Sequence, residues 1–319
     1  RIVSHATDDV PVTPTFDNPP AGVTRLGRPR HIGIDVVRAL CLIGVVVMNY
    51  HGKMNYGSDR RPSTAHLVQR VFDVDTGILT TRFAATFVVV AGIAVAFLTE
   101  TSRTSTSVRT TTDTRLRLVR RGCVLLVSGY FLDFAWPGTI LFYYGAYFIA
   151  SAVLFRLRSR TLLGLALLVT AGATALTSWR NVQLSHARST AWLEPDDVST
   201  FRDLVLRLFV GYTHPIFPWL AFLTVGMVIG RWYTHLIDRW KSISLGLMAL
   251  LVLTYGIVTT ARILDLDRGS IAHTLVSMHP DDRSVAYVIS TLAIATTTIL
   301  IVSAAASRWR ESPLIQVLQ

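Results

Sequence analysis

The stretch from Ile32 to His51, IGIDVVRALCLIGVVVMNYH, constrains the fold more than any other part of the chain. It is long and apolar enough to cross a bilayer as a helix, yet it contains Asp35, Arg38 and Asn49. A charged group at membrane depth costs at least about 2.5–3.5 kcal/mol. At about 100° per residue the three polar side chains share one helix face, so they form a stripe that must face protein or water. An Asp35–Arg38 pair that neutralises itself near the membrane interface is the alternative, and it leaves Asn49 unexplained.

Further apolar runs place this stretch in a polytopic membrane protein. Hydrophobic residues make up 51% of the 319-residue chain and charged residues 16%, whereas soluble domains have about 25% charged residues. We therefore predict an all-α transmembrane helix bundle with about eight spans. They cover approximately 33–50, 82–99, 118–135, 139–155, 161–178, 214–232, 243–263 and 285–306.

The distribution of charge predicts the orientation of these spans. The net charge of +11 comes from arginines in short segments between apolar runs, which is the positive-inside pattern rather than a nucleic-acid surface. The alternate segments are richer in acidic residues, so we expect both the N-terminus and the end of the printed sequence on the cytoplasmic side. We expect an integral protein of a plasma membrane that contacts lipid and does not bind nucleic acid.

Three segments outside the spans have a distinct composition. Residues 1–31 are rich in Pro, Thr and Asp without periodicity, which predicts a disordered cytoplasmic tail before a membrane domain over 32–319. The Ser/Thr/Arg-rich stretch 101–114 predicts a flexible connector. Residues 201–212 are amphipathic, which is typical of a helix that lies at the membrane interface.

The two cysteines indicate neither a disulfide nor a metal site. Cys41 and Cys123 lie within apolar runs and are expected to be small core residues. Motifs with metal-ligand spacing are absent from the sequence, so we predict no metal cofactor.

Histidines gather on the side that the charge pattern places outside the cell. A histidine can serve as a general base or can carry an acyl group, so an outer cluster suits chemistry on an extracytoplasmic substrate. The best candidates are His51 and His214, which lie where a span meets the interface, followed by His66. Scattered, solvated loop histidines are the alternative.

The segment 211–231, GYTHPIFPWLAFLTVGMVIGR, contains two prolines at the entry of an apolar run. Pro215 and Pro218 are expected to open the helix there, and such a break is tolerated where it lines a cavity or finds new partners. His214 and Trp219 would lie at the opening. An ordinary proline-initiated helix with an interfacial tryptophan also fits.

The segment 115–148 combines a basic start with aromatic residues. Its arginines can bind phosphates through bidentate hydrogen bonds, as in an acyl donor such as coenzyme A, and they also fit ordinary positive-inside residues near anionic lipid. They are Arg115, Arg117, Arg120 and Arg121. Asp133 is expected at the outer end of its helix, and Tyr143 and Tyr144 are expected to face the bundle.

Four segments together resemble a known family. The stretches IDVVRALCLIGVVVMN (34–49), RFAATFVVVAGIAVAF (82–97), RLRLVRRGCVLLVSGYF to ILFYYGAYF (115–148) and 211–231 are similar to the heparan-α-glucosaminide N-acetyltransferase-like family of bacterial polytopic membrane proteins. The resemblance implies a helix bundle that moves an acetyl group from cytoplasmic acetyl-CoA to a sugar on the far side, with a histidine at the non-cytoplasmic end. It also implies further helices beyond residue 319.

The sequence and the resemblance together predict a transmembrane acyltransferase of a bacterial plasma membrane. Acetyl-CoA or another acyl-CoA would be the co-substrate, and the acceptor a glycan or lipid-linked sugar of the cell envelope. Catalysis would involve His51, His214, His66, Asp35, Arg38 and Asn49; the arginines from Arg115 to Arg121 would bind the donor; and Trp219, Asp133 and Tyr144 would contact substrate. A homo-oligomer or a larger membrane complex is compatible with this reading. The alternative is a transporter, flippase or scaffold subunit without enzymatic activity.

Overall fold

The computed structural model describes residues 31–55, 71–73, 77–136, 138–195, 198–211, 213–264, 270–309 and 312. The chain divides into two compact units, 1–31 and 32–319, and the fold described here is that of the second. Apart from His31, the predicted tail over 1–31 lies outside the described residues.

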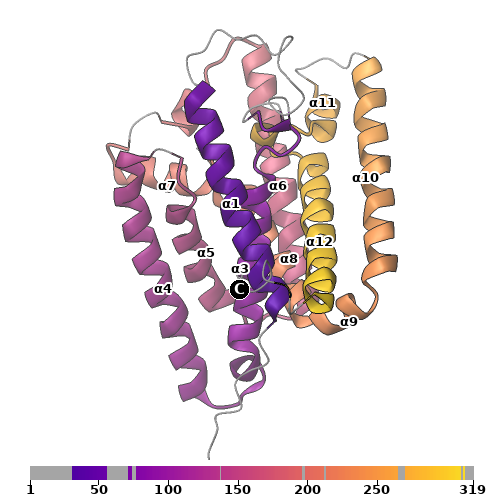
Figure 1. Cartoon of the computed structure of the whole chain (residues 1–319). Coiled ribbons are helices and arrows are strands. Elements are labelled where there is room, and N and C mark those ends of the chain that lie inside the picture. Colours follow the sequence, from indigo (N-terminus) through magenta and orange to yellow (C-terminus); the bar gives the residue numbers. More distant parts are fainter. Residues whose placement is uncertain are drawn as a thin grey trace, which may run out of the picture. The chain divides into compact units, whose positions relative to one another are not determined.

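The described part of the second unit is all-helical (Figure 1). Its long helices are α1 (Ile32–Asn55), α3 (Arg82–Thr104), α4 (Val108–Ala135), α5 (Leu141–Leu154), α6 (Ser159–Ser185), α8 (Ile216–Arg231), α10 (Trp240–Ile263) and α12 (Val285–Arg308). Short helices join them: η2 (Ala191–Leu193), α7 (Phe201–Phe209), α9 (Tyr233–Asp238), α11 (Ile271–Val276) and η3 (Pro280–Asp282). Figure 1 shows α7 and α11 at one end of the bundle, here called the upper end, and α9 at the other.

Five of the eight predicted spans are confirmed as helices that are long and apolar enough to cross a membrane: α1, α3, α6, α10 and α12. The apolar helices α5 and α8 are shorter, with 14 and 16 residues. Helix α4 has 28 residues, but arginines occupy its first half. The eight-span count and the orientation of the N-terminus therefore stay predictions.

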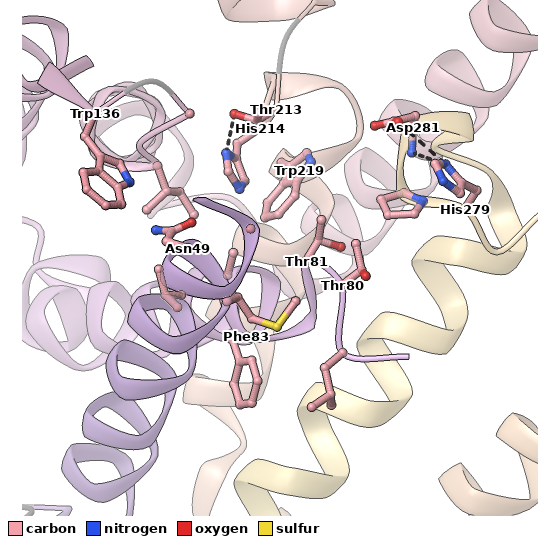
Figure 2. A pocket seen from close by; sticks show the side chains of 18 residues that line it. Asn49, Thr80, Thr81, Phe83, Trp136, Thr213, His214, Trp219, His279 and Asp281 are labelled. Atoms are coloured by element: carbon pink, nitrogen blue, oxygen red, sulfur yellow. Dashed lines mark hydrogen bonds and ion pairs between the residues drawn. The ribbon is translucent and has the colours of Figure 1, made fainter. Parts of the chain in front are cut away.

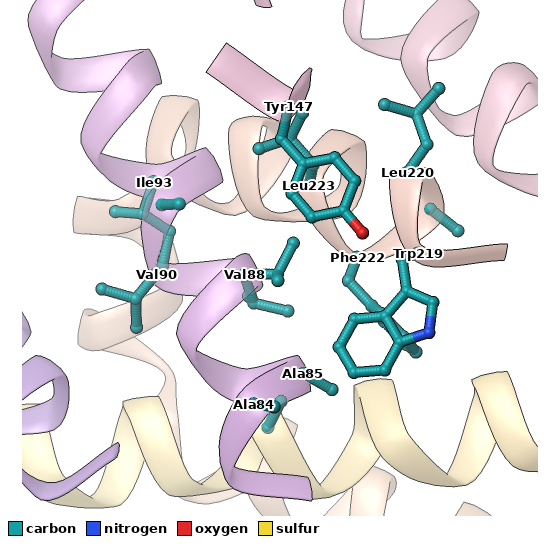
Figure 3. Packing of buried hydrophobic residues seen from close by; sticks show 14 of the residues in the cluster. Ala84, Ala85, Val88, Val90, Ile93, Tyr147, Trp219, Leu220, Phe222 and Leu223 are labelled. Carbon is teal, nitrogen blue, oxygen red and sulfur yellow. The ribbon is translucent and has the colours of Figure 1, made fainter. Parts of the chain in front are cut away.

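Helices α3 and α8 form the centre of the bundle and pack side by side in parallel. Their glycines allow the backbones to meet, since a Cβ atom at Gly92 would lie 2.2 Å from the Leu223 carbonyl oxygen and one at Gly226 would lie 2.2 Å from that of Val89. Small residues permit such close approach between membrane helices. Figure 3 shows the apolar side chains of this contact, with Trp219 and Phe222 packed beside Ala84, Ala85 and Val88.

Helices α4 and α5 form a second close pair, which is antiparallel. A Cβ atom at Gly129 would lie 2.2 Å from the Phe142 backbone nitrogen, and one at Gly145 would lie 2.4 Å from that of Leu126. As predicted, Tyr143 and Tyr144 on α5 are buried in the bundle. Helix α10 packs mainly on α12 and exposes most of its surface.

Two expectations were wrong. The stretch 101–114 is almost entirely helical, because α3 continues to Thr104 and the Ser107 side chain caps α4 by accepting the Thr110 N–H. A hydrogen bond of 2.6 Å between Ser102 and Thr114 joins the two helices. Cys123 is exposed on α4, whereas Cys41 is buried as predicted, and both are free thiols.

The structure confirms a helix within 201–212 and the proline-interrupted entry of α8, while the position of the first at a membrane interface stays a prediction. Helix α7 forms over Phe201–Phe209, where Thr200 and Asp203 build a capping box at its start. Helix α8 departs from helical geometry at Phe217 (φ −94°, ψ 116°), immediately before Pro218. The loop residues before α8 thereby reach the upper end of the bundle core.

Candidate functional site

A cavity of about 660 Å³ lies at the upper end of the bundle, where α1 ends and α3 and α8 begin (Figure 2). Its walls come from segments that are far apart in the sequence, with apolar side chains between polar ones. The polar side chains are Asn49, Thr80, Thr81, Thr213, His214, His279 and Asp281, and the aromatic ones are Phe83, Trp136 and Trp219. Such a mixture of apolar surface and a few polar groups is typical of a small-molecule site.

Contacts to its side chain and to its backbone hold His214 in place. Its Nδ1 atom lies 2.7 Å from the Thr213 hydroxyl, and its backbone carbonyl accepts a hydrogen bond of 2.6 Å from Tyr147. The ring packs edge-on against Trp219 at 4.5 Å between centroids. Desolvation, and secondly the positive charge of Arg283, lower the pKa of His214 to about 3. The imidazole is therefore neutral at physiological pH.

The entry to α3 contributes two hydroxyls to the cavity. Thr81 occupies the left-handed region (φ 59°), which is unusual for a β-branched residue. Its Oγ1 atom lies 2.7 Å from the Tyr287 hydroxyl of α12, and the preceding Thr80 donates a hydrogen bond of 2.7 Å to the Asp73 carbonyl. Strained backbone of this kind clusters at functional sites. The two threonines are fixed by neighbours on both sides.

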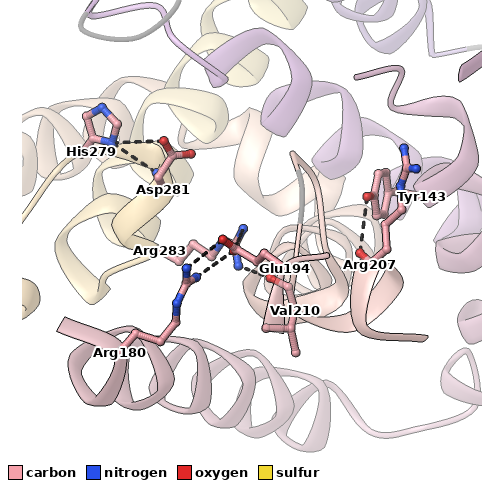
Figure 4. A network of polar contacts seen from close by, with 8 residues as sticks. All are labelled: Tyr143, Arg180, Glu194, Arg207, Val210, His279, Asp281 and Arg283. Atoms are coloured by element: carbon pink, nitrogen blue, oxygen red, sulfur yellow. Dashed lines mark hydrogen bonds and ion pairs between the residues drawn. The ribbon is translucent and has the colours of Figure 1, made fainter. Parts of the chain in front are cut away.

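A network of ion pairs supports the loop that carries His279 and Asp281 (Figure 4). Arg180 on α6 makes two hydrogen bonds of 2.7 Å to the Glu194 carboxylate, and Arg283 lies 3.5 Å from the same carboxylate. Arg283 also donates to the Val210 carbonyl. One partly buried carboxylate–guanidinium cluster therefore connects the end of α6, η2, the end of α7 and the loop before α12.

Among the predicted catalytic residues that the structure describes, Asn49 and His214 line the cavity, whereas Asp35, Arg38 and His51 do not. Asp35 and Arg38 pair with each other at 3.3 Å in the first turns of α1, and the Arg38 side chain is 54% exposed. The polar stripe of α1 is thus divided between the Asp35–Arg38 pair near its start and Asn49 in the cavity. His51 is half-buried on α1 and is not a lining residue, while His66 lies outside the described residues.

Of the predicted substrate residues, only Trp219 reaches the cavity. Asp133 pairs with Arg207 and accepts a hydrogen bond of 3.0 Å from the Gly138 N–H, beside a separate small pocket. Tyr144 donates a hydrogen bond of 2.7 Å to the Phe87 carbonyl and stacks on the Phe87 ring at 4.9 Å. Both side chains hold helices together at the places where the structure puts them.

Three of the four predicted donor-binding arginines border a groove of about 550 Å³ on α4 and α5. Its lining consists of Arg117, Arg120, Arg121, Val124, Leu125 and Phe148, and Arg115 lies one turn before them. None of the four pairs with a carboxylate in the part of the chain that the structure describes. The groove thus joins a row of unneutralised guanidinium groups to an apolar floor.

Sequence reasoning missed several cavity residues. Thr80, Thr81 and Trp136 come from segments whose only signal was their position at the edge of an apolar run, and His279 is a loop histidine on the side predicted to be outside, with no neighbouring motif to distinguish it. Asp281 gave no separate signal. Among the described residues, no group of three His, Cys, Asp or Glu side chains is placed to hold a metal ion.

Comparison with protein-family models gives a match that covers residues 30–262. The matching model is described as "Heparan-alpha-glucosaminide N-acetyltransferase, catalytic". No curated protein and no solved structure matches the chain in the corresponding comparisons. The matched range includes Asn49, His214 and Trp219, and it ends before His279.

Proposed function

The chain belongs to the family of heparan-alpha-glucosaminide N-acetyltransferase catalytic domains, and on that premise we propose that it transfers an acetyl or other acyl group from acyl-CoA to a sugar across a membrane. The family suggests a transmembrane acetyltransferase, and the five long apolar helices agree with an integral membrane protein. The observation that carries the proposal is the cavity, in which Asn49, His214 and Trp219 from distant parts of the matched range meet.

The arginine groove is the proposed place for the phosphates of the donor. Guanidinium groups suit phosphate oxygens because they donate hydrogen bonds in pairs, and Arg117, Arg120 and Arg121 lack carboxylate partners among the described residues. From Arg121 to Trp136 the chain rises about 22 Å along α4 at 1.5 Å per residue. The extended arm of the donor would cover this distance and bring its thioester to the cavity.

The cavity offers suitable groups for both reaction partners. The Asn49 amide, and the Thr81 hydroxyl when it accepts from Tyr287, can donate hydrogen bonds to a thioester oxygen as negative charge develops on it. Trp136, which is half-buried, can supply a flat apolar face for a sugar ring, and the buried Trp219 supports the wall beside His214. A neutral His214 can donate or accept one hydrogen bond in the same place, while roles for His51 and His66 stay predictions.

This proposal includes an orientation. With the N-terminus in the cytoplasm, the arginine groove faces cytoplasmic acyl-CoA and the upper end faces the outside, where a glycan or lipid-linked sugar of a bacterial envelope would be the acceptor. The excess of arginine in the segments at the lower end supports this orientation. The acyl group then moves across the membrane while the phosphates of the donor stay on the cytoplasmic side.

Turnover by the purified protein in detergent tests the proposal. Acetyl-CoA would be the donor and glucosamine the acceptor probe, with release of the CoA thiol as the readout. We expect turnover by the unmodified protein and a loss of about 100-fold or more in Asn49→Ala, as for other donors to a developing oxyanion. His235→Gln, an exposed histidine on α9, is the matched control. Failure of the folded protein to bind acetyl-CoA would contradict the proposal and favour a transporter or scaffold.

A further inference from the structure

We infer that His279 is the general base that removes a proton from the acceptor, with Asp281 orienting its imidazole. This inference rests on the acyl transfer proposed above, and it adds a catalytic residue outside the range 30–262 that the family model matches. Both side chains line the cavity that also contains Asn49 and His214. They belong to the loop before α12, on a different wall from the end of α1.

The geometry of the pair leaves one imidazole nitrogen for a substrate. The Nδ1 atom of His279 faces Asp281, with the Asp281 backbone nitrogen at 3.4 Å and carboxylate oxygen Oδ2 at 3.7 Å. Nε2 makes no hydrogen bond or ion pair within the described part of the chain. The Asp281 side chain is 86% exposed and is free to turn toward Nδ1. In the structure Nδ1 accepts the Asp281 N–H. Once the Asp281 carboxylate turns and accepts a proton from Nδ1 in place of that bond, the Nε2 lone pair becomes available to the acceptor, and catalytic hydrogen bonds of this kind often tighten only when substrate binds.

The loop that presents the pair is fixed from both ends. The Ser277 hydroxyl accepts the His279 N–H at 3.2 Å and contacts the Asp282 carboxylate, and the Ser284 hydroxyl donates to the Ser277 carbonyl. Arg283 then ties the loop to the Val210 carbonyl and to Glu194. A catalytic group has to be held within about 0.5 Å of its productive position by its surroundings, and the contacts of this loop supply such a support.

The other imidazole of the cavity is unsuited to the same task. The pKa of His214 is lowered to about 3 by desolvation and by Arg283, so that ring is a weak base at neutral pH. His279 instead has a side chain that is 43% exposed and a carboxylate neighbour. Two groups of one type in different environments are a common sign of divided roles in an active site.

The proposed step balances with acyl-CoA as the only co-reactant. The neutral amine nitrogen of the acceptor attacks the thioester carbonyl carbon, so that a C–N bond forms and the C–S bond breaks. His279 Nε2 takes one proton from the attacking nitrogen. The sulfur leaves as a thiolate and then receives that proton, which yields the acylated sugar and the CoA thiol.

A purely structural role for His279 makes a different prediction. The imidazole is also the N-cap of η3, because Nδ1 accepts the Asp281 N–H. Asparagine is a good N-cap residue but cannot serve as a base at neutral pH. His279→Asn therefore separates the two roles: it keeps the cap and removes the base.

The test compares steady-state turnover of acetyl-CoA and glucosamine by the full chain in detergent with that of three variants. We expect kcat to fall by about 10²–10⁴-fold in His279→Asn with the KM for acetyl-CoA unchanged, and to fall less in Asp281→Asn. Added imidazole should restore part of the activity of His279→Ala. His235→Gln again serves as control.

Each outcome distinguishes this inference from the proposed function. If the unmodified protein turns over acetyl-CoA and the kcat of His279→Asn stays within about twofold of it, His279 is a helix cap and not the base. The proposed transferase activity is then still supported. Loss of activity in His279→Ala without any rescue by imidazole also overturns the base. If the unmodified protein neither binds nor turns over acetyl-CoA, the proposed function fails and the inference fails with it.

Discussion

The two candidate ligand sites of this chain differ in how their polar groups are satisfied. At the upper cavity, the buried polar groups are engaged with protein partners, as in the contacts of His214 with Thr213 and of Thr81 with Tyr287. In the groove on α4, Arg117, Arg120 and Arg121 are exposed and have no carboxylate partner among the described residues. The first site is organised by the fold, while the second needs an outside anion to complete it.

This difference has a physical basis. Buried polar groups without partners cost free energy, so a site built inside a bundle has to satisfy its own hydrogen bonds before any ligand arrives. Guanidinium groups at a surface stay hydrated and need no partner in the folded protein. Substitutions in the cavity should therefore reduce stability, whereas substitutions in the groove should reduce only the affinity for an anionic ligand.

The largest effect on stability is expected from Trp219→Ala. The Trp219 side chain is 2% exposed and packs against His214 and Phe222, so its truncation leaves a void that costs about 3–5 kcal/mol in comparable cores. Thermal unfolding in detergent measures this loss. Trp232→Ala is the matched control, because Trp232 lies at the other end of the same helix and is 56% exposed. If both variants lower the free energy of unfolding equally, the packing around the cavity contributes no more to stability than the packing of a surface tryptophan.

The sequence predicted the helices better than it predicted the site, for a physical reason. Apolar runs of about 20 residues can satisfy their backbone in a membrane only as helices, so α1, α3, α6, α10 and α12 followed directly from composition. Pro218 likewise predicted the irregular start of α8. By contrast, the Ser/Thr-rich stretch 101–114 became helical through the cap at Ser107 and the Ser102–Thr114 hydrogen bond, which depend on the packing of two helices.

The site required information that periodicity does not contain. Asp133 appeared available for substrate until the structure placed Arg207, 74 residues later, beside it. The cavity brings together the end of α1, the start of α3, the turn after α4, the loop before α8 and the loop before α12. A sequence shows that each segment ends near an interface, but only the packing of the helices decides which ends meet.

A smaller effect is expected from the pH dependence that His214 gives to stability. Its pKa is about 3 in the folded protein and about 6.5 in an unfolded chain. Between these two pKa values the unfolded state binds a proton at His214 and the folded state does not. The contribution of His214 to the free energy of unfolding is therefore fully present above pH 6.5 and is lost as the pH falls toward 3. Between pH 7 and pH 5 the loss is about 2 kcal/mol.

Unfolding at several pH values measures this contribution as a difference between two proteins. His214→Gln lacks the titrating group, so its stability should fall less steeply between pH 7 and pH 5 than that of the unmodified protein. If stability depends on pH equally in both proteins, His214 titrates like a solvated histidine. The cavity would then be less organised by the fold than its contacts indicate.

The smallest effect on stability is expected in the groove, where the double substitution Arg120→Gln and Arg121→Gln should change the free energy of unfolding by no more than about 0.5 kcal/mol. The affinity for acetyl-CoA should nevertheless fall, because a hydrogen bond to a charged group contributes about 1.5–3 kcal/mol, which corresponds to tenfold or more.

Raising the salt concentration should weaken binding of acetyl-CoA to the unmodified protein and have less effect on the double variant, since exposed charges are screened. Arg160→Gln, on the first turn of α6 and outside the groove, is the matched control. Unchanged affinity in the double variant would remove the groove from the donor path, while a large loss of stability would show that its arginines are as closely engaged with the protein as the cavity residues.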